Sequence, residues 1–220
     1  MTMPIDKRNF VPVVGYPIVL DLSGRRCVVV GGGAVAERKV EGLLAAGAAV
    51  TVVSPELTEG LEARAARREI KLARRCYRRG DLAGASLAFV AVGEPRLSAA
   101  VAREGRRQGV WVNAADDPEH CDFFLPSILR RGKLVVAIAT GGASPALARA
   151  VREEIERLLP TDYAELAETV AEVRRELKAR GVRPDASAWN RALAAEMRHL
   201  TANGGPRKAR ARLFSSLGTP

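Results

Sequence analysis

Three glycines at positions 31–33 follow a short run of valines and come directly before a segment with helical periodicity. In a strand, turn and helix of this kind, Gly31 permits the tight turn and Gly33 lets a pyrophosphate approach the backbone. The phosphates would lie against the first helical residues, Ala34 and Val35, where unpaired N–H groups and the helix dipole favour negative charge. The pattern predicts a dinucleotide-binding turn. The alternative is a structural turn in another kind of doubly wound domain.

The end of the next expected strand, residues 48–53, is a second candidate contact. Dinucleotide-binding units commonly place an Asp or Glu there, about 20 residues beyond the glycines, to hold the ribose hydroxyls. This chain has Ser54, Pro55 and Glu56 instead. The Ser54 hydroxyl and the Glu56 carboxylate can both serve, and no arginine directly adjoins Ser54 to accept a 2′-phosphate. We therefore expect the cofactor to be NAD rather than NADP.

An acidic, irregular segment follows the strand expected over residues 110–113. Asp116 lies just past the end of that strand, where its carboxylate could act as a general base or hold a metal ion in transit. His120 and Cys121 are also metal-capable, but their spacing fits no standard zinc site. We therefore expect no permanent metal, and a solvated acidic loop is the alternative for this segment.

Strands alternate with helices around these candidate residues. The alternation predicts an α/β fold with a Rossmann-like, right-handed, doubly wound parallel sheet. Strands are expected over residues 28–30, 48–53, 70–74, 87–92 and 110–113, and helices over residues 34–46, 56–68 and 94–107. Ligands of such sheets bind beyond the carboxyl ends of the strands. Gly93 and Asn113 should therefore meet the glycines and Ser54 at one edge.

A second turn of small residues, Thr140-Gly141-Gly142-Ala143-Ser144-Pro145, joins a strand expected over residues 134–139 to a helix over residues 146–159. Ser144 can cap this helix, and proline is favoured at the first helical position. The pattern predicts a second anion-receptive helix start, and a plain strand-to-helix turn is the alternative.

The composition indicates a soluble globular protein. The 220 residues are 47% hydrophobic, which is enough for a proper core. Since no apolar run approaches the ~20 residues that span a bilayer, and the first eight residues lack the apolar region of a signal peptide, we expect a cytoplasmic protein. The three cysteines, Cys27, Cys76 and Cys121, are too few for a disulfide framework.

The formal net charge of +10 biases the surface toward anionic partners. Much of the excess lies at residues 64–79 and 207–212. These arginines lack the interleaved aromatic residues and the motifs of nucleic-acid binding, so we expect no nucleic-acid partner. They are interpreted as solvated surface, or as the complement of a polyanionic small molecule.

The C-terminal part is expected to be helical over residues 163–180 and 186–201. Each segment carries a stripe of apolar residues at helical spacing. The stripes are formed by Leu166, Val170, Val173 and Leu177, and by Trp189, Leu193, Met197 and Leu200. Helices this short cannot bury such stripes alone, so they must pack on the sheet domain or on another subunit.

Five motifs, taken together and in order, resemble the dehydrogenase module of the siroheme synthase family. The resemblance covers roughly residues 16–181, and five ordered motifs are far more specific than the glycines alone. The motifs are VVGGGAVAERK at 29–39, LLAAGA at 43–48, NAADDP at 113–118, FLPSI at 124–128 and TGGASPALAR at 140–149.

The resemblance implies NAD-dependent oxidation of precorrin-2, a tetrapyrrole polycarboxylate, to sirohydrochlorin; some family members also insert ferrous iron. It makes Asp116 the catalytic residue, in transient contact with iron where chelation occurs. It adds Thr140, Gly141 and Ser144 to Asn113 and Asp116 as substrate contacts. It also implies a homodimer. One departure is Gly93, which stands where a polar turn residue is common and weakens a polar cofactor contact there.

The expected domains are an NAD-binding Rossmann-like domain over residues 14–115, a dimerisation and substrate-site region over residues 116–149, and a helical domain with a basic tail over residues 150–220. Because the chain ends at Pro220, no methyltransferase domain is expected. The alternative function is a nucleotide-sensing regulatory Rossmann domain without chemistry.

Overall fold

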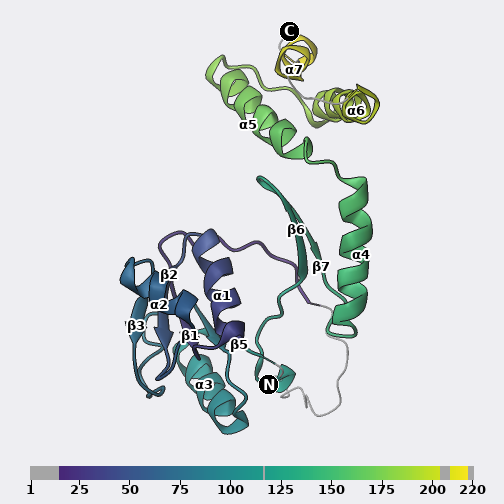
Figure 1. Cartoon of the computed structure of the whole chain (residues 1–220). Helices are drawn as coiled ribbons and strands as arrows, with labels where there is room; N and C mark the ends of the chain where they lie inside the picture. The colour runs from purple at the N-terminus through teal and green to yellow at the C-terminus, as the bar shows by residue number, and fades with distance from the viewer. Residues whose placement is uncertain (1–14, 116, 204–208, 218–220) are drawn as a thin grey trace, which may run out of the picture. The chain divides into compact units, whose positions relative to one another are not determined.

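The computed structural model describes residues 15–115, 117–203 and 209–217, and of residues 198–203 it describes the backbone alone. The chain divides into two compact units, Met1–Phe124 and Leu125–Pro220. We call them the sheet unit and the helical unit (Figure 1). The predicted division into three parts stays a prediction.

The sheet unit is built on a parallel five-stranded sheet in the order β3-β2-β1-β4-β5. Its central strand pairs on both sides, so Val29 lies beside Val52 and beside Phe89. The predicted α/β fold with a parallel sheet is confirmed. The strands are β1 (Arg26–Val30), β2 (Ala49–Val53), β3 (Lys71–Ala73), β4 (Leu87–Val90) and β5 (Trp111–Ala114).

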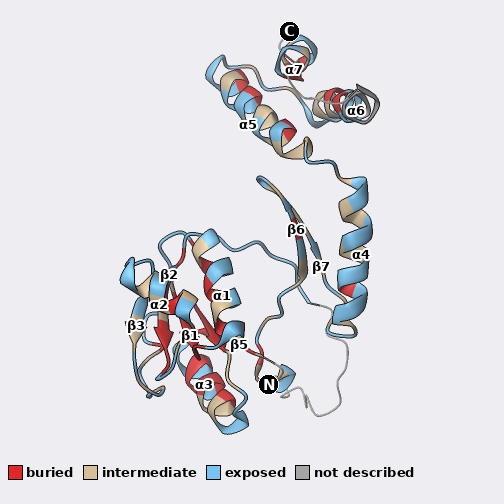
Figure 2. Ribbon diagram, viewed as in Figure 1, coloured by how far each residue is buried: buried red, intermediate tan, exposed pale blue. Residues whose placement is uncertain are grey.

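Helices cover both faces of this sheet, which explains why its strands read as continuous apolar runs. Helices α1 (Ala34–Ala45) and α2 (Glu59–Ala66) pack on one face, and α3 (Pro95–Gln108) packs on the other. Figure 2 shows the buried residues concentrated in these strands and on the inner sides of the helices. The crossovers place every strand's carboxyl end at the same edge, where the glycines lie.

The edge of β5 is covered by the segment that follows it. After the short helix η1 (Pro118–His120), the Asp122 N–H donates to the Val112 carbonyl at 2.7 Å. The Asp122 carboxylate accepts the Val112 N–H at 2.9 Å. Phe123 then packs edge-on against Phe89, with ring centroids 5.4 Å apart. This segment is therefore part of the sheet unit's structure rather than a freely solvated loop.

The helical unit begins with a two-stranded antiparallel sheet, β6 (Ser127–Arg131) and β7 (Leu134–Ile138), against which α4 (Pro145–Leu158) packs. Helices α5 (Tyr163–Ala179), α6 (Ala186–Asn203) and α7 (Ala209–Leu217) share a second small core. Strand β6 and helix α7 were not expected as separate elements. The predicted basic tail is in part helix α7, whose Leu213 is fully buried.

The predicted stripe on α5 is confirmed, since Leu166, Val173 and Leu177 are buried. The stripe on α6 is partly wrong. Met197 is 43% exposed, whereas the neighbouring Glu196 is only 3% exposed. The Arg212 guanidinium of α7 donates two hydrogen bonds to the Glu196 carboxylate, each at 2.6 Å. These bonds offset the cost of burying a charged side chain on the packed face of α6.

None of the described helices is long and apolar enough to cross a membrane.

Candidate functional site

The turn formed by Gly31–Gly33, called the glycine turn below, is held in place by its neighbours. Gly31 has a φ of +119°, a region that side chains rarely adopt, and a Cβ there would lie 2.6 Å from the Ala91 carbonyl oxygen. The Gly31 N–H donates to the Val53 carbonyl at 3.0 Å. The turn is therefore fixed between the ends of β2 and β4.

Gly32 is the most confined of the three glycines, and no role was predicted for it. A Cβ at this position would lie 2.0 Å from the Glu56 carbonyl oxygen and 2.8 Å from the Ser54 hydroxyl oxygen. The Gly32 carbonyl also accepts the Thr58 N–H at 2.9 Å. The run of three glycines was the only hint in the sequence that the second glycine is required. Glu56, whose carbonyl leaves no room for a side chain at Gly32, lies 24 residues away in the chain.

Gly33 and the start of α1 form the open side of the turn. Gly33 is exposed, and among the described atoms none lies within 4 Å of where its Cβ would be. It is also the N-cap of α1, where no described side chain accepts a hydrogen bond. The first helical N–H groups, at Ala34 and Val35, thus keep their capacity to bind an anion. An open cradle with free donors fits the pyrophosphate of a dinucleotide.

Residues 54–57, called the ribose loop below, lie directly against the glycine turn. Ser54 is buried, and its hydroxyl donates to the Glu56 carbonyl at 2.6 Å. The hydroxyl proton is therefore donated within the loop. This hydrogen bond helps to hold the loop backbone, a structural role that was not predicted for Ser54. Pro55 and the Glu56 side chain are exposed at the same edge. Glu56 is the group in this loop best placed to meet a ribose hydroxyl.

Gly93 follows β4 at the same edge and is exposed, as expected for the rim of a ligand site. Asn113 lies at the end of β5 but is buried. Its amide nitrogen donates to the Phe123 carbonyl at 2.9 Å and lies 3.6 Å from the Cys121 sulfur. The structure thus brings the glycine turn, Ser54, Gly93 and Asn113 to one edge, while it turns the Asn113 amide toward the segment that covers β5.

Cys121 has a structural role. Its buried thiol accepts the Ala114 N–H and donates to the Ala114 carbonyl, each at 3.2 Å. In the same segment, the Asp117 carboxylate contacts Nδ1 of His120 at 2.8 Å. Within the described part of the chain, no three metal-capable side chains gather into a group. Asp116, the predicted catalytic residue, lies outside the described residues.

The second predicted turn, residues 140–144, is called the α4 turn below. Both of its glycines have positive φ values, 60° at Gly141 and 86° at Gly142. The Thr140 hydroxyl accepts the Ser144 N–H at 3.0 Å and donates to the Ser144 carbonyl at 3.1 Å. Ser144 in turn caps α4, because its hydroxyl accepts the Leu147 N–H at 3.1 Å. The predicted cap by Ser144 is confirmed, and it occupies one of the first N–H groups of the helix.

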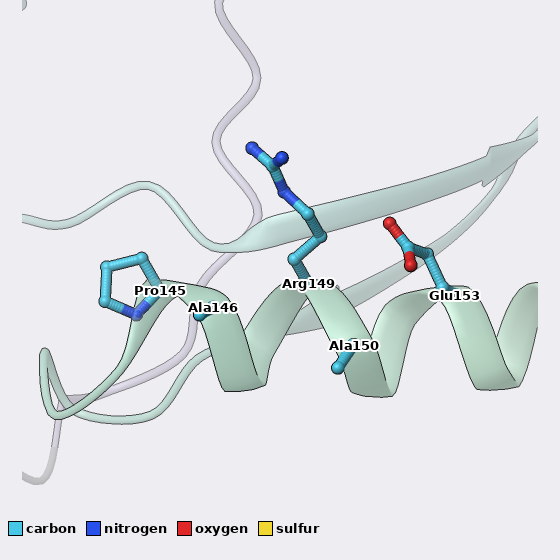
Figure 3. Close-up of a pocket in the computed structure, with 5 residues that line it drawn as sticks. All are labelled: Pro145, Ala146, Arg149, Ala150 and Glu153. Carbon is cyan, nitrogen blue, oxygen red and sulfur yellow. The ribbon is translucent and has the colours of Figure 1, made fainter.

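A shallow depression of about 340 Å³ lies at the start of α4 and is lined by residues of this helix between Pro145 and Glu153. Figure 3 shows the Arg149 side chain extending from this helix, with Glu153 one turn further along on the same side. Arg149 is exposed. Its guanidinium gives the first part of α4 an exposed cationic group.

Several arginines of the basic clusters are paired with carboxylates. Arg64 and Arg67 both bind Glu69, and Arg75 binds Asp81. The Arg75 hydrogen bonds hold the pKa of Asp81 below its ordinary value. Part of the positive charge is therefore neutralised within the fold, which favours the interpretation of these clusters as surface structure.

Comparison with known proteins agrees with this division of the chain. A sequence family described as "Putative NAD(P)-binding" matches residues 18–127, which is half of the chain. A second family, "Sirohaem biosynthesis protein central", matches residues 131–158. The chain belongs to the NAD(P)-binding family, and a nicotinamide cofactor follows from that membership. It corresponds to the N-terminal module of siroheme synthase.

Relatives and solved structures support this membership. The siroheme synthase of Methylobacillus flagellatus is 43% identical over 164 residues, which are 74% of this chain and 35% of that protein. The siroheme synthase of Chromobacterium violaceum is 39% identical over 202 residues, 90% of this chain and 43% of that protein. The chain thus spans about two fifths of these relatives' length. The structure of SirC, a precorrin-2 dehydrogenase, superposes with a TM-score of 0.71 at 26% identity, covering 93% of this chain and 100% of that one.

Proposed function

We propose that this chain oxidises precorrin-2 to sirohydrochlorin with NAD as the oxidant. The observation that carries the proposal is the likeness to precorrin-2 dehydrogenase SirC, which covers 93% of this chain and therefore extends over both units. A nucleotide-sensing domain without chemistry would account for the sheet unit alone. The family match in the helical unit, at residues 131–158, favours the enzyme.

The glycine turn and the start of α1 would hold the coenzyme. Its pyrophosphate would be bound by the N–H groups of Ala34 and Val35, over the open side of Gly33. The ribose loop would meet the adenosine ribose, with the Glu56 carboxylate accepting a hydrogen bond from a hydroxyl and repelling a 2′-phosphate. Bound there, NAD supplies a hydride acceptor. We therefore propose NAD, rather than NADP, as the coenzyme.

The oxidation removes a hydride and a proton from the substrate, so a base is needed for the proton. We propose Asp116 for this role because in the sequence it comes two residues after Ala114, the last residue of β5. Asp117 is a poorer candidate because its carboxylate contacts His120. Where iron insertion occurs, Asp116 would also be the transient contact of the ferrous ion.

The substrate is a polycarboxylate, so its site needs donors and positive charge. We propose five residues as substrate contacts: Asn113, Asp116, Thr140, Gly141 and Ser144. Capping by Ser144 and the Thr140 hydrogen bonds make the α4 turn rigid, so its exposed face can orient a large planar ligand. The neighbouring Arg149 guanidinium would bind a substrate carboxylate.

We further infer a cytoplasmic homodimer. Apolar side chains remain exposed in the helical unit, including Ile128 at 45%, Leu147 at 56% and Leu158 at 73%. A second copy of the chain would bury such residues and gain the free energy of removing them from water. Light scattering on the purified protein tests this: a mass of two chains supports the inference, and a stable monomer contradicts it.

The function is tested by anaerobic incubation of the pure protein with precorrin-2 and NAD. The proposal predicts that sirohydrochlorin and NADH form in equal amounts, and that NADP supports the reaction poorly. Adding ferrous or cobaltous ion to a parallel sample measures chelation separately. NADH binding without any oxidation of precorrin-2 would favour the nucleotide-sensing alternative.

A further inference from the structure

Arg74 is well separated from the ribose loop in the sequence, but the fold brings it close to that loop. The Ser54 N–H donates to the Ala73 carbonyl at 3.2 Å, which joins the start of the ribose loop to the last residue of β3. Arg74 is the next residue along the chain. Because β2 and β3 are parallel, Arg74 leaves the sheet at the same edge as the ribose loop.

The Arg74 side chain is engaged by a carboxylate of α2. Its Nη2 donates to both oxygens of Glu62, each at 2.6 Å. The pair lies at the surface, with the Arg74 side chain 55% exposed and that of Glu62 42% exposed. An exposed pair of this kind contributes little to folding. Its charges can therefore be changed without removing a structural support of the sheet.

Arg75, the next cation in the sequence, is committed elsewhere. Its guanidinium makes two hydrogen bonds to the Asp81 carboxylate, at 2.7 and 2.8 Å. Asp81 also accepts the Arg78 N–H at 2.8 Å, so the pair belongs to the connection between β3 and β4. Of the two neighbouring arginines, Arg74 is therefore the one that contacts α2, and it directly follows the residue bonded to the ribose loop.

We propose that the Glu62–Arg74 ion pair sets the preference for NAD over NADP by withholding Arg74 from the 2′ position of the adenosine ribose. A 2′-phosphate needs an arginine near the end of the second strand. Here the arginine is present, but Glu62 engages its Nη2 and holds the guanidinium against α2, and Glu56 adds a second carboxylate at the same edge. The inference rests on the proposed coenzyme site.

The test is a binding titration of the full-length protein with NADH and NADPH, followed by nicotinamide fluorescence. Glu62→Gln keeps the size of the side chain but removes the charge that holds Arg74. Once it is freed, Arg74 can make charge-assisted hydrogen bonds to the 2′-phosphate. The variant should therefore bind NADPH about tenfold more tightly than the wild type does. The affinity for NADH should stay unchanged.

Glu69→Gln is the matched control. It removes the same charge and releases two arginines, Arg64 and Arg67. Glu69 precedes β3, however, so it lies at the opposite edge of the sheet from the ribose loop. If only the net charge mattered, both variants would improve NADPH binding equally. The proposal predicts that Glu69→Gln leaves both affinities unchanged.

The double variant Glu62→Gln with Arg74→Gln identifies the arginine. It should return NADPH affinity to the wild-type value, because the gain depends on Arg74. Unchanged NADPH binding by Glu62→Gln, in a protein that still binds NADH, would overturn this inference alone, as would a gain that persists in the double variant. Absence of NADH binding in the wild type would overturn the proposed coenzyme site and this inference with it.

Discussion

The glycine turn and the α4 turn both lead from a strand into a helix through small residues, but they treat the first N–H groups of the helix differently. At α1, no described side chain caps the helix, and Gly33 leaves open space in front of it. At α4, the Ser144 hydroxyl already accepts the Leu147 N–H. A helix start binds an anion only where its donors lack acceptors.

This difference in capping indicates different roles for the two turns. The glycine turn leaves donors free for a pyrophosphate, whereas the α4 turn uses its hydroxyls to hold its own backbone. Thr140 and Ser144 would therefore present a fixed surface to the substrate, and Arg149 would supply the positive charge that the capped helix start does not. Four predictions test this contrast.

The largest effect is expected at the open turn. Gly33→Asp places a carboxylate where the phosphates would lie and should abolish NADH binding, while the open space around Gly33 lets the protein fold. Fluorescence titration measures the binding, and thermal unfolding confirms the fold. Gly42→Asp is the matched control, because Gly42 is an exposed residue of the same helix with equally open space. Normal NADH affinity in folded Gly33→Asp would remove the basis of the contrast.

The second prediction asks whether the chemistry lies after β5 rather than at either turn. Asp116→Asn keeps the shape of the side chain but cannot accept the proton, so dehydrogenase turnover should fall by a factor of ~10² to 10⁴. NADH binding should survive, and any chelation should fall too. Asp117→Asn, which changes a carboxylate that contacts His120, should be milder. The wrong carboxylate has been chosen if Asp117→Asn has the larger effect on steady-state turnover.

The third prediction compares the two ligands. A tetrapyrrole polycarboxylate should lose more apparent affinity than NADH as salt is raised, because it carries more charge and salt screens each attraction. Steady-state kinetics and NADH titration over a range of ionic strength measure the two slopes. Arg149→Gln should reduce the slope for the substrate alone. Equal slopes for both ligands would argue against an electrostatic role for the helical unit.

The smallest effect is expected at the capped turn. Ser144→Ala removes the acceptor of the Leu147 N–H and should lower the free energy of unfolding by about 1 kcal/mol. Thr58→Ala is a comparable control, because Thr58 caps α2 through the Leu61 N–H. Chemical denaturation measures both. NADH affinity should not change in Ser144→Ala; a large loss of NADH binding without destabilisation would show that this turn binds the coenzyme.

The parallel sheet could be predicted because its strands are buried on both faces, so β1, β2 and β4 appear as apolar runs between helices. The position of the glycine turn followed from the same pattern. Contacts between distant residues could not be predicted. Gly32 is confined by the Glu56 carbonyl, and Arg74 follows the residue that bonds to Ser54 because β3 pairs with β2.

Prediction also failed where charged residues pack. Helix α7 resembled a solvated basic tail because it begins among arginines, but Arg212 pairs with the buried Glu196 of α6. The hydrogen bond from the Ser54 hydroxyl to the Glu56 carbonyl was not predicted either, and the ribose contact of Ser54 stays a prediction. A pairing partner chosen by the tertiary fold leaves no signal in local spacing.

The most direct test of the contrast is a nitrogen–proton correlation spectrum of the labelled protein during titration with NADH. If the pyrophosphate binds at the glycine turn, the Ala34 and Val35 amide signals should show large, saturable shifts, while the Ala146 and Leu147 amide signals at the start of α4 stay in place. Shifts at Ala146 and Leu147 without shifts at Ala34 and Val35 would contradict binding at the glycine turn.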